Sequence, residues 1–126
     1  MNNQWKYVEN LNAGKIKKLE DFLGFELPSD YKEKLPYINR GKPEKYIFKT
    51  GNKECVLDYM IDIDEIPKFM KNLPEGLIPF ATDPFGNFIC FKYEKDKFQE
   101  IVFYDHETDK YFSVTKSFSD FLESLY

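Results

Sequence analysis

The stretch LIPFATDPFGNFICF, residues 77–91, decides the predicted fold because it is typical of a strand, a tight turn and a second strand. Asp83, Pro84 and Gly86 stand at the first, second and fourth positions of the turn, where a type I turn favours these residue types. After the turn, apolar residues occupy both alternating faces of the chain as far as Tyr93. A strand that is apolar on both faces belongs in the middle of a covered sheet, so we expect the rest of the chain to pack around it.

Two helices are predicted before this hairpin. Asn12 is a suitable N-cap for a helix over residues 13–23, and Gly24 suits the left-handed position that ends such a helix. Ser29 is a candidate N-cap for a second, short helix. We expect this second helix to end early or to kink at Pro36, because proline has no N–H for the helical hydrogen bond.

Alternating residues predict further strands on either side of the central hairpin. They cover residues 46–49, 54–60, 100–104 and 111–114. The first two are joined through Gly51 and Asn52, which suit a two-residue hairpin turn. In the second of them, Cys55, Leu57 and Tyr59 are expected to share one face.

Two more helices complete the predicted fold. A mid-chain helix begins near Asp64 with Pro67 in its first turn, and Ser117 caps a final helix. Strands in the centre with helices toward both ends predict an α+β fold of one domain, residues 1–126. We expect a mainly antiparallel central sheet of about five to six strands, helices near both termini and one mid-chain helix.

Composition limits the function. Aromatic residues make up 18% of the chain, so we expect a core built largely of rings. The net charge of −4 disfavours direct nucleic-acid binding, which usually needs a basic surface. Cys55 and Cys90 lie in apolar runs and are interpreted as free thiols in the cytoplasm, although their spacing leaves a disulfide open. No apolar run has the length of a signal peptide or a membrane span.

The chain resembles the SUKH superfamily, which is named partly for a fungal cell-wall-synthesis regulator. The resemblance rests on five pieces in the same order: residues 16–31 with Leu27-Pro28-Ser29-Asp30-Tyr31, then Asn39-Arg40-Gly41, residues 77–83 with 86–90, residues 102–107, and residues 117–122. The chain departs from the family pattern at Arg40, where the family usually has glycine. If this position needs a positive φ, arginine costs about 1 kcal/mol or more there.

The resemblance implies an α+β fold without catalytic machinery. Many bacterial members look like immunity proteins that bind and neutralise a toxin, often a nuclease. Other relatives look like regulatory or adaptor domains with a non-toxin cellular partner, which is the alternative function for this chain.

Residues capable of chemistry are few. His106 is the only histidine, whereas acid–base catalysis needs a second group at a defined distance and zinc usually takes several His or Cys ligands. We therefore interpret His106 as structural and predict no catalytic residues, metal or cofactor. A hydrolase with paired carboxylates is the weakest hypothesis. Asp83, Gly86 and Asn87 are interpreted as turn-forming residues, because Asp and Asn side chains bond to nearby backbone N–H groups.

Acidic residues are concentrated in two stretches. Residues 54–66 carry a net charge of −5 and residues 99–126 a net charge of −4. One interpretation is a solvated face with acids at helix starts, and the other is a negative surface for a basic toxin. Neither nucleic acid nor a membrane is an expected direct partner. The candidate binding residues are Glu54, Asp58, Asp62, Asp64, Glu65, Asp105, Glu107 and Asp109.

Overall fold

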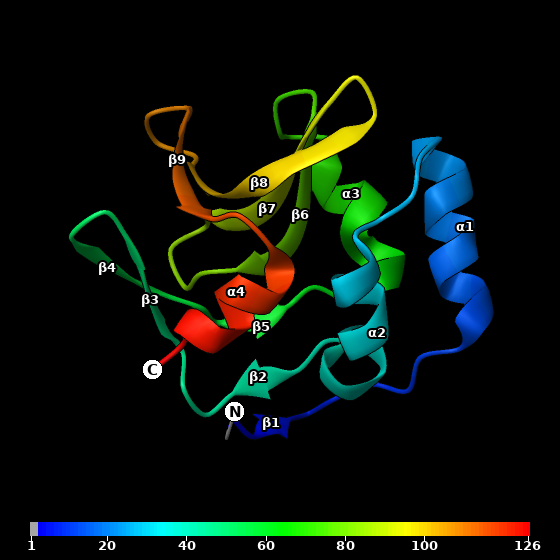
Figure 1. Ribbon diagram of the computed structural model, residues 1–126, viewed down its shortest axis with the longest axis horizontal. Coiled ribbons are helices and arrows are strands. Elements are labelled where there is room, and N and C mark those ends of the chain that lie inside the picture. Colours follow the sequence, from blue (N-terminus) through cyan, green and yellow to red (C-terminus); the bar gives the residue numbers. More distant parts are fainter. Residues whose placement is uncertain (1–2) are drawn as a thin grey trace.

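The computed structural model describes residues 3–126 (Figure 1). The helices are α1 (Ala13–Leu23), α2 (Ser29–Ile38), the 3-10 helix η1 (Ile63–Glu65), α3 (Ile66–Met70) and α4 (Phe118–Ser124). The strands are β1 (Trp5–Lys6), β2 (Lys42–Pro43), β3 (Ile47–Thr50), β4 (Lys53–Val56), β5 (Tyr59–Met60), β6 (Leu77–Thr82), β7 (Phe88–Glu94), β8 (Lys97–Asp105) and β9 (Lys110–Thr115). The predicted α+β class is confirmed.

The main sheet has the antiparallel order β5-β6-β7-β8-β9, and β7 lies at its centre. Ile89 and Phe91 of β7 belong to the main core, whereas Cys90 packs on the other face of the sheet with Val102 and Tyr104. The central position predicted for this strand is therefore confirmed. In Figure 1 the β3–β4 hairpin projects on one side of the sheet, and α1 lies on the opposite side.

Aromatic rings fill the core between the sheet and the helices α2 and α4. The ring centroid of Phe91 lies 4.5 Å from that of Phe80 and 4.9 Å from that of Tyr31. Phe118 of α4 contacts Tyr31 edge to face at 5.1 Å. Offset and edge-to-face pairs add about 0.5–1.5 kcal/mol each to the burial of their surface, so this cluster holds the layers together.

The caps of α1 and α4 are as predicted. The backbone N–H of Gly14 donates to Asn12 Oδ1 at 2.9 Å, and Gly24 ends α1 with a φ of 84°. The hydroxyl of Ser117 accepts the N–H of Asp120 at 3.0 Å at the start of α4. Each cap satisfies a backbone group that the helix leaves unpaired, which fixes where the helix begins or ends.

The prediction for α2 is wrong at its start, and α2 does not end early at Pro36. Ser29 is the first helical residue, and Pro28 stands before it without a side-chain cap. The helix also continues past Pro36. Because Leu35 and Ile38 are buried in the core, packing of the last turn compensates for the hydrogen bond that proline removes.

The predicted strand 54–60 divides into β4 and β5 because the chain changes partners. The N–H of Leu57 donates to the carbonyl of Tyr46 beside β3, and the next N–H, of Asp58, donates to the carbonyl of Thr82 in β6. Tyr59 is therefore exposed and does not share the buried face of β4, contrary to the prediction.

Arg40 adopts a φ of 64°, in the left-handed region where the family pattern has glycine. The strain of about 1 kcal/mol is therefore present. The side chain reaches back to the N-terminal segment, where Arg40 Nη1 lies 2.8 Å from Glu9 Oε1.

Candidate functional site

The loop between β6 and β7 is organised around the carboxylate of Asp83. Its Oδ1 accepts the backbone N–H groups of Phe85 at 2.9 Å and Asn87 at 2.7 Å, and its Oδ2 accepts the Asn87 amide N–H at 2.9 Å. Gly86 completes the turn with a φ of 87°. Asp83, Gly86 and Asn87 thus form the turn itself, and this turn presents Phe85 to solvent with 70% of its surface exposed.

The loop between β8 and β9 is fastened to this turn through His106. The backbone N–H of His106 donates to Asn87 Oδ1 at 3.0 Å, and its ring Nδ1 lies 2.7 Å from the same oxygen. Because the amide N–H of Asn87 is directed at Asp83, Oδ1 faces His106 as an acceptor and Nδ1 carries the proton. The geometry gives His106 a structural contact between the two loops.

A groove of about 320 Å³ lies between these two loops and β4. We call it the acidic groove. Four carboxylates line it together with one lysine, Lys53, the exposed ring of Phe85 and the buried Cys55. The four carboxylates are those of Glu54, Asp83, Asp105 and Glu107. The fold therefore brings Glu54 next to acids that stand about fifty positions later in the chain.

Two carboxylates of the groove make hydrogen bonds that affect a pKa. The backbone N–H of Glu107 donates to Asp105 Oδ1 at 2.9 Å, and this bond lowers the pKa of the Asp105 carboxyl. The carboxylate of Glu54 accepts the hydroxyl of Tyr126, which raises the pKa of that tyrosine. Burial raises the pKa of the Cys55 thiol, so Cys55 is not an activated nucleophile.

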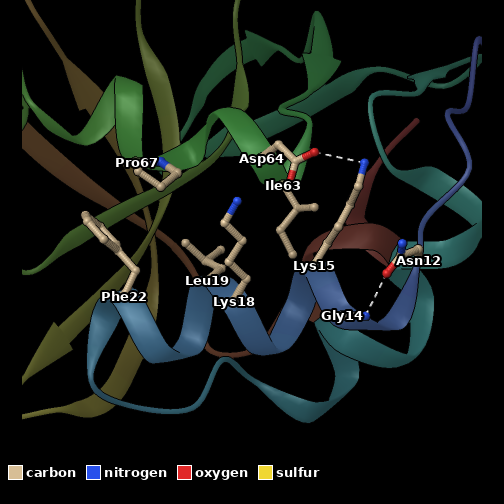
Figure 2. Close-up of a pocket in the computed structure, with 9 residues that line it drawn as sticks. All are labelled: Asn12, Gly14, Lys15, Lys18, Leu19, Phe22, Ile63, Asp64 and Pro67. Atoms are coloured by element: carbon tan, nitrogen blue, oxygen red, sulfur yellow. Dashed lines mark hydrogen bonds and ion pairs between the residues drawn. The ribbon is translucent and has the colours of Figure 1, made fainter.

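The remaining candidate acids lie elsewhere. Asp58 pairs with Lys42 at 2.6 Å, and Asp64 pairs with Lys15 at 2.8 Å (Figure 2). Oδ1 of Asp62 accepts the N–H of Asp64 at 3.1 Å and caps η1.

The last two candidates also lie apart from each other. Glu65 lines a separate recess together with Asp62, Arg40 and Lys42, and Asp109 accepts the hydroxyl of Tyr104. Of the eight candidates, the structure thus gathers Glu54, Asp105 and Glu107 in the acidic groove, and Asp62 and Glu65 in this second recess.

Sequence reasoning missed Phe85 as a candidate contact residue. The available signal was a large apolar ring at the third position of a predicted type I turn, a position that faces solvent. It also assigned Asp83 a turn role alone, whereas the charge of Asp83 adds to the field of the groove.

Residues 3–126 contain neither a metal-binding cluster nor a membrane-spanning helix. No group of three or more His, Cys, Asp and Glu side chains is arranged to hold a metal ion in this part of the chain. Within the same residues, every helix is too short or too polar to cross a membrane.

Comparison with known proteins places the chain in a family. The profile of the SMI1 / KNR4 family (SUKH-1) matches residues 10–124. The chain belongs to this family. The match extends from just before α1 to the end of α4, so it includes the main sheet and all three segments of the acidic groove.

A relative of this SMI1 / KNR4 family chain is found in Bacillus subtilis (strain 168). It is described as the SPbeta prophage-derived uncharacterized protein YokK, and it is 27% identical over an alignment that covers 87% of this chain and 72% of the relative. Membership of the family therefore agrees with the resemblance seen in the sequence.

Proposed function

We propose that this chain is a non-enzymatic immunity protein that binds a cognate bacterial toxin in the cytoplasm and blocks it without a cofactor. The acidic groove is the observation that carries the proposal. It offers several carboxylates and one exposed aromatic ring, which suits a basic protein surface. Membership of the SMI1 / KNR4 family, many of whose bacterial members look like immunity proteins, supports the same function.

A nuclease toxin is the partner class that fits this surface best. Such an enzyme needs lysine and arginine side chains to hold phosphates, and the same side chains are attracted by a negative groove. In the proposed complex, basic side chains of the toxin contact Glu54, Asp105 and Glu107, while Phe85 packs against the toxin as an apolar anchor. Neither a membrane nor direct contact with nucleic acid is involved.

The test begins with the reading frame beside this gene, in which we expect a large protein with a toxin-like C-terminal domain. The neighbouring toxin domain is expressed with the wild-type chain or with variants, and growth and binding of the purified proteins are measured. We expect the wild type to rescue growth, and Phe85→Ser with Glu107→Lys to bind at least tenfold more weakly. Glu33→Lys with Glu44→Lys is the control, because both residues are exposed and lie outside the groove.

Two outcomes would contradict the proposal. Equal binding by the groove variant and the control would show that the acidic groove does not contact the toxin. Failure of the wild type to bind or rescue would favour the alternative, a regulatory or adaptor domain with a non-toxin cellular partner.

A further inference from the structure

The recess that Asp62 and Glu65 share has a volume of about 310 Å³ and lies where the chain after β1 meets β2, β5 and η1. The N–H of Met60 donates to the carbonyl of Gly41 at 2.9 Å, so β5 is held beside β2 (Figure 1). Three aromatic side chains from different parts of the chain line this recess, and we call it the tyrosine recess. They are those of Tyr7, Tyr59 and Phe69.

The two cations that line the tyrosine recess are already paired with acids outside it. Arg40 Nη1 lies 2.8 Å from Glu9 Oε1, and Lys42 Nζ lies 2.6 Å from Asp58 Oδ1. The two acids that line the recess, by contrast, form no ion pair within residues 3–126. The recess therefore leaves two carboxylates to pair with a cation from outside the chain.

Aromatic rings border these carboxylates. Tyr7 leaves 76% of its surface exposed, and Tyr59 leaves 36%. Phe69 is half-buried and contacts Phe88, with 5.5 Å between the ring centroids. The face of an aromatic ring is negative, so rings beside carboxylates favour a cation. Arginine suits such a site better than lysine, because its planar guanidinium stacks on a ring while its N–H groups donate to carboxylates.

The backbone of Tyr7 is held in an unfavourable conformation. Its φ is 62°, in the left-handed region that large residues rarely adopt. The N–H of Glu9 donates to the carbonyl of Asn39 at 2.9 Å and fixes the chain just after this residue. Strained residues cluster at binding positions, and here the strain accompanies an aromatic ring that stands in solvent.

The exposure of the tyrosine recess indicates that the cation belongs to a protein. A site for a free small molecule usually encloses most of its ligand, whereas Tyr7 and Glu65 are both exposed. A second copy of this chain is excluded as the source of an arginine, because Arg40 is the only arginine in the sequence and lines the recess itself. The occupant that fits is an arginine on the surface of a different protein.

We propose that the tyrosine recess binds an arginine side chain of a partner protein. The guanidinium stacks on the ring of Tyr7, and its N–H groups donate to the carboxylate of Glu65 and to the oxygen of Asp62 that does not cap η1. Arg40 stays paired with Glu9. This site does not depend on the proposed immunity function, because the tyrosine recess and the acidic groove share no lining residue.

The test is a titration of the full chain with a tripeptide that carries arginine between two glycines and has blocked ends. Amide chemical shifts report where the peptide binds, and we expect the changes at Tyr7, Tyr59 and Glu65. A single side chain binds weakly, so we expect a Kd of about 10 mM. The same peptide with citrulline, which has the shape of arginine without its charge, should not bind, and the lysine peptide should bind more weakly than the arginine peptide.

Variants of the recess separate the ring from the charge. Tyr7→Ala should weaken binding of the arginine peptide about threefold or more, whereas Tyr7→Phe keeps the ring and should bind like the wild type. Glu65→Gln should also weaken binding. Tyr37→Ala and Glu33→Gln are the matched controls, because both residues are exposed and lie outside the recess. Thermal melting checks that each variant is folded.

Several results would overturn the proposal. Equal binding of the citrulline peptide would show that the charge is not recognised, and tighter binding of the lysine peptide would assign the recess to an ammonium group. Shifts confined to the acidic groove, or unchanged binding by folded Tyr7→Ala and Glu65→Gln, would locate the contact elsewhere. Shifts that do not saturate by about 50 mM peptide would mean that the recess does not bind arginine.

Discussion

Asn87 and His106 are joined at two points, since a single side-chain oxygen of Asn87 faces both the backbone N–H and the ring Nδ1 of His106. The other side of the same amide donates to Asp83. The two loops that border the acidic groove are therefore one unit, and the spacing between Asp83 and Asp105 is set by this contact.

We expect His106→Ala to lower the free energy of unfolding by about 0.5–1.5 kcal/mol, because the ring contact is lost while the backbone bond to Asn87 remains. Denaturant unfolding measures the change, and toxin binding by the folded variant should stay close to that of the wild type. Asn87→Ala removes the side-chain contacts to both loops, so it should lower the free energy of unfolding more than His106→Ala does. A folded His106→Ala protein that no longer binds would show that His106 touches the partner directly.

Gly86→Ala should destabilise the protein more than Gly24→Ala. Both glycines have a positive φ, 87° and 84°, so both substitutions meet a backbone strain of about 1–2 kcal/mol. A Cβ on Gly24 meets no atom within 4 Å, whereas a Cβ on Gly86 would lie 3.2 Å from the His106 ring. Equal shifts in unfolding midpoint would mean that the His106 ring moves aside without cost.

Phe91→Ala should lower the free energy of unfolding by about 3–5 kcal/mol, because the Phe91 ring is completely buried among Phe80, Tyr31 and Phe118. Phe88 is only half-buried on the other face of the sheet against Phe69, so Phe88→Ala should cost less. Urea unfolding of both variants gives the comparison. A loss below about 1 kcal/mol at Phe91 is incompatible with a central, covered strand.

Asp105 should make the stability depend on pH. The Glu107 N–H lowers the pKa of Asp105 in the folded state, so its stabilising effect is complete above the ordinary pKa of about 3.9. The effect is lost as the pH falls through the lower, folded pKa. In thermal melts, the gap between wild type and Asp105→Asn should therefore be largest near neutral pH and shrink in acid. A gap that stays constant would show that the carboxylate does not titrate differently on folding.

Charge reversal should separate the two groups of acids. A variant that carries Lys in place of Glu54, Asp105 and Glu107 should associate with the toxin slower by an order of magnitude or more at low salt. The difference from the wild type should shrink near 1 M salt, where the Debye length is about 3 Å.

The same reversal of Asp62, Asp64 and Glu65 is the comparison. It should slow association less, since Lys15 already neutralises Asp64. Thermal melting checks folding, because Asp62 caps η1. Equal association rates for the folded groove variant and the wild type would leave the acidic groove as a merely solvated surface.

Local signals were sufficient to predict the central hairpin and the ends of α1 and α4. The turn at Asp83 and the caps at Asn12, Gly24 and Ser117 are hydrogen bonds between residues close in sequence, which follow from residue type. The wrong predictions concern features that depend on tertiary packing. The last turn of α2 survives Pro36 because its neighbours are buried, and burial is not visible in a short window.

The acidic groove was beyond prediction for the same reason. Its walls come from β4 and from two loops, and they meet because the backbone at Leu57 and Asp58 passes from β3 to β6. Periodicity continues unbroken through those residues, so the sequence shows acids without showing which of them are neighbours. The turn at Lys95 and Asp96 has a positive φ at both residues, and only Asp96 is of a type that such turns favour.

The two thiols lie at different depths, and this makes them reporters of different events. Cys55 lines the acidic groove with 7% of its surface exposed, while Cys90 is completely buried under the opposite face of the sheet. An alkylating reagent reaches Cys55 when the groove opens locally, whereas Cys90 reacts only when the sheet itself opens. Labelling at Cys55 thus reports local opening at the groove, and labelling at Cys90 in the same tube reports opening of the sheet, without any engineered probe.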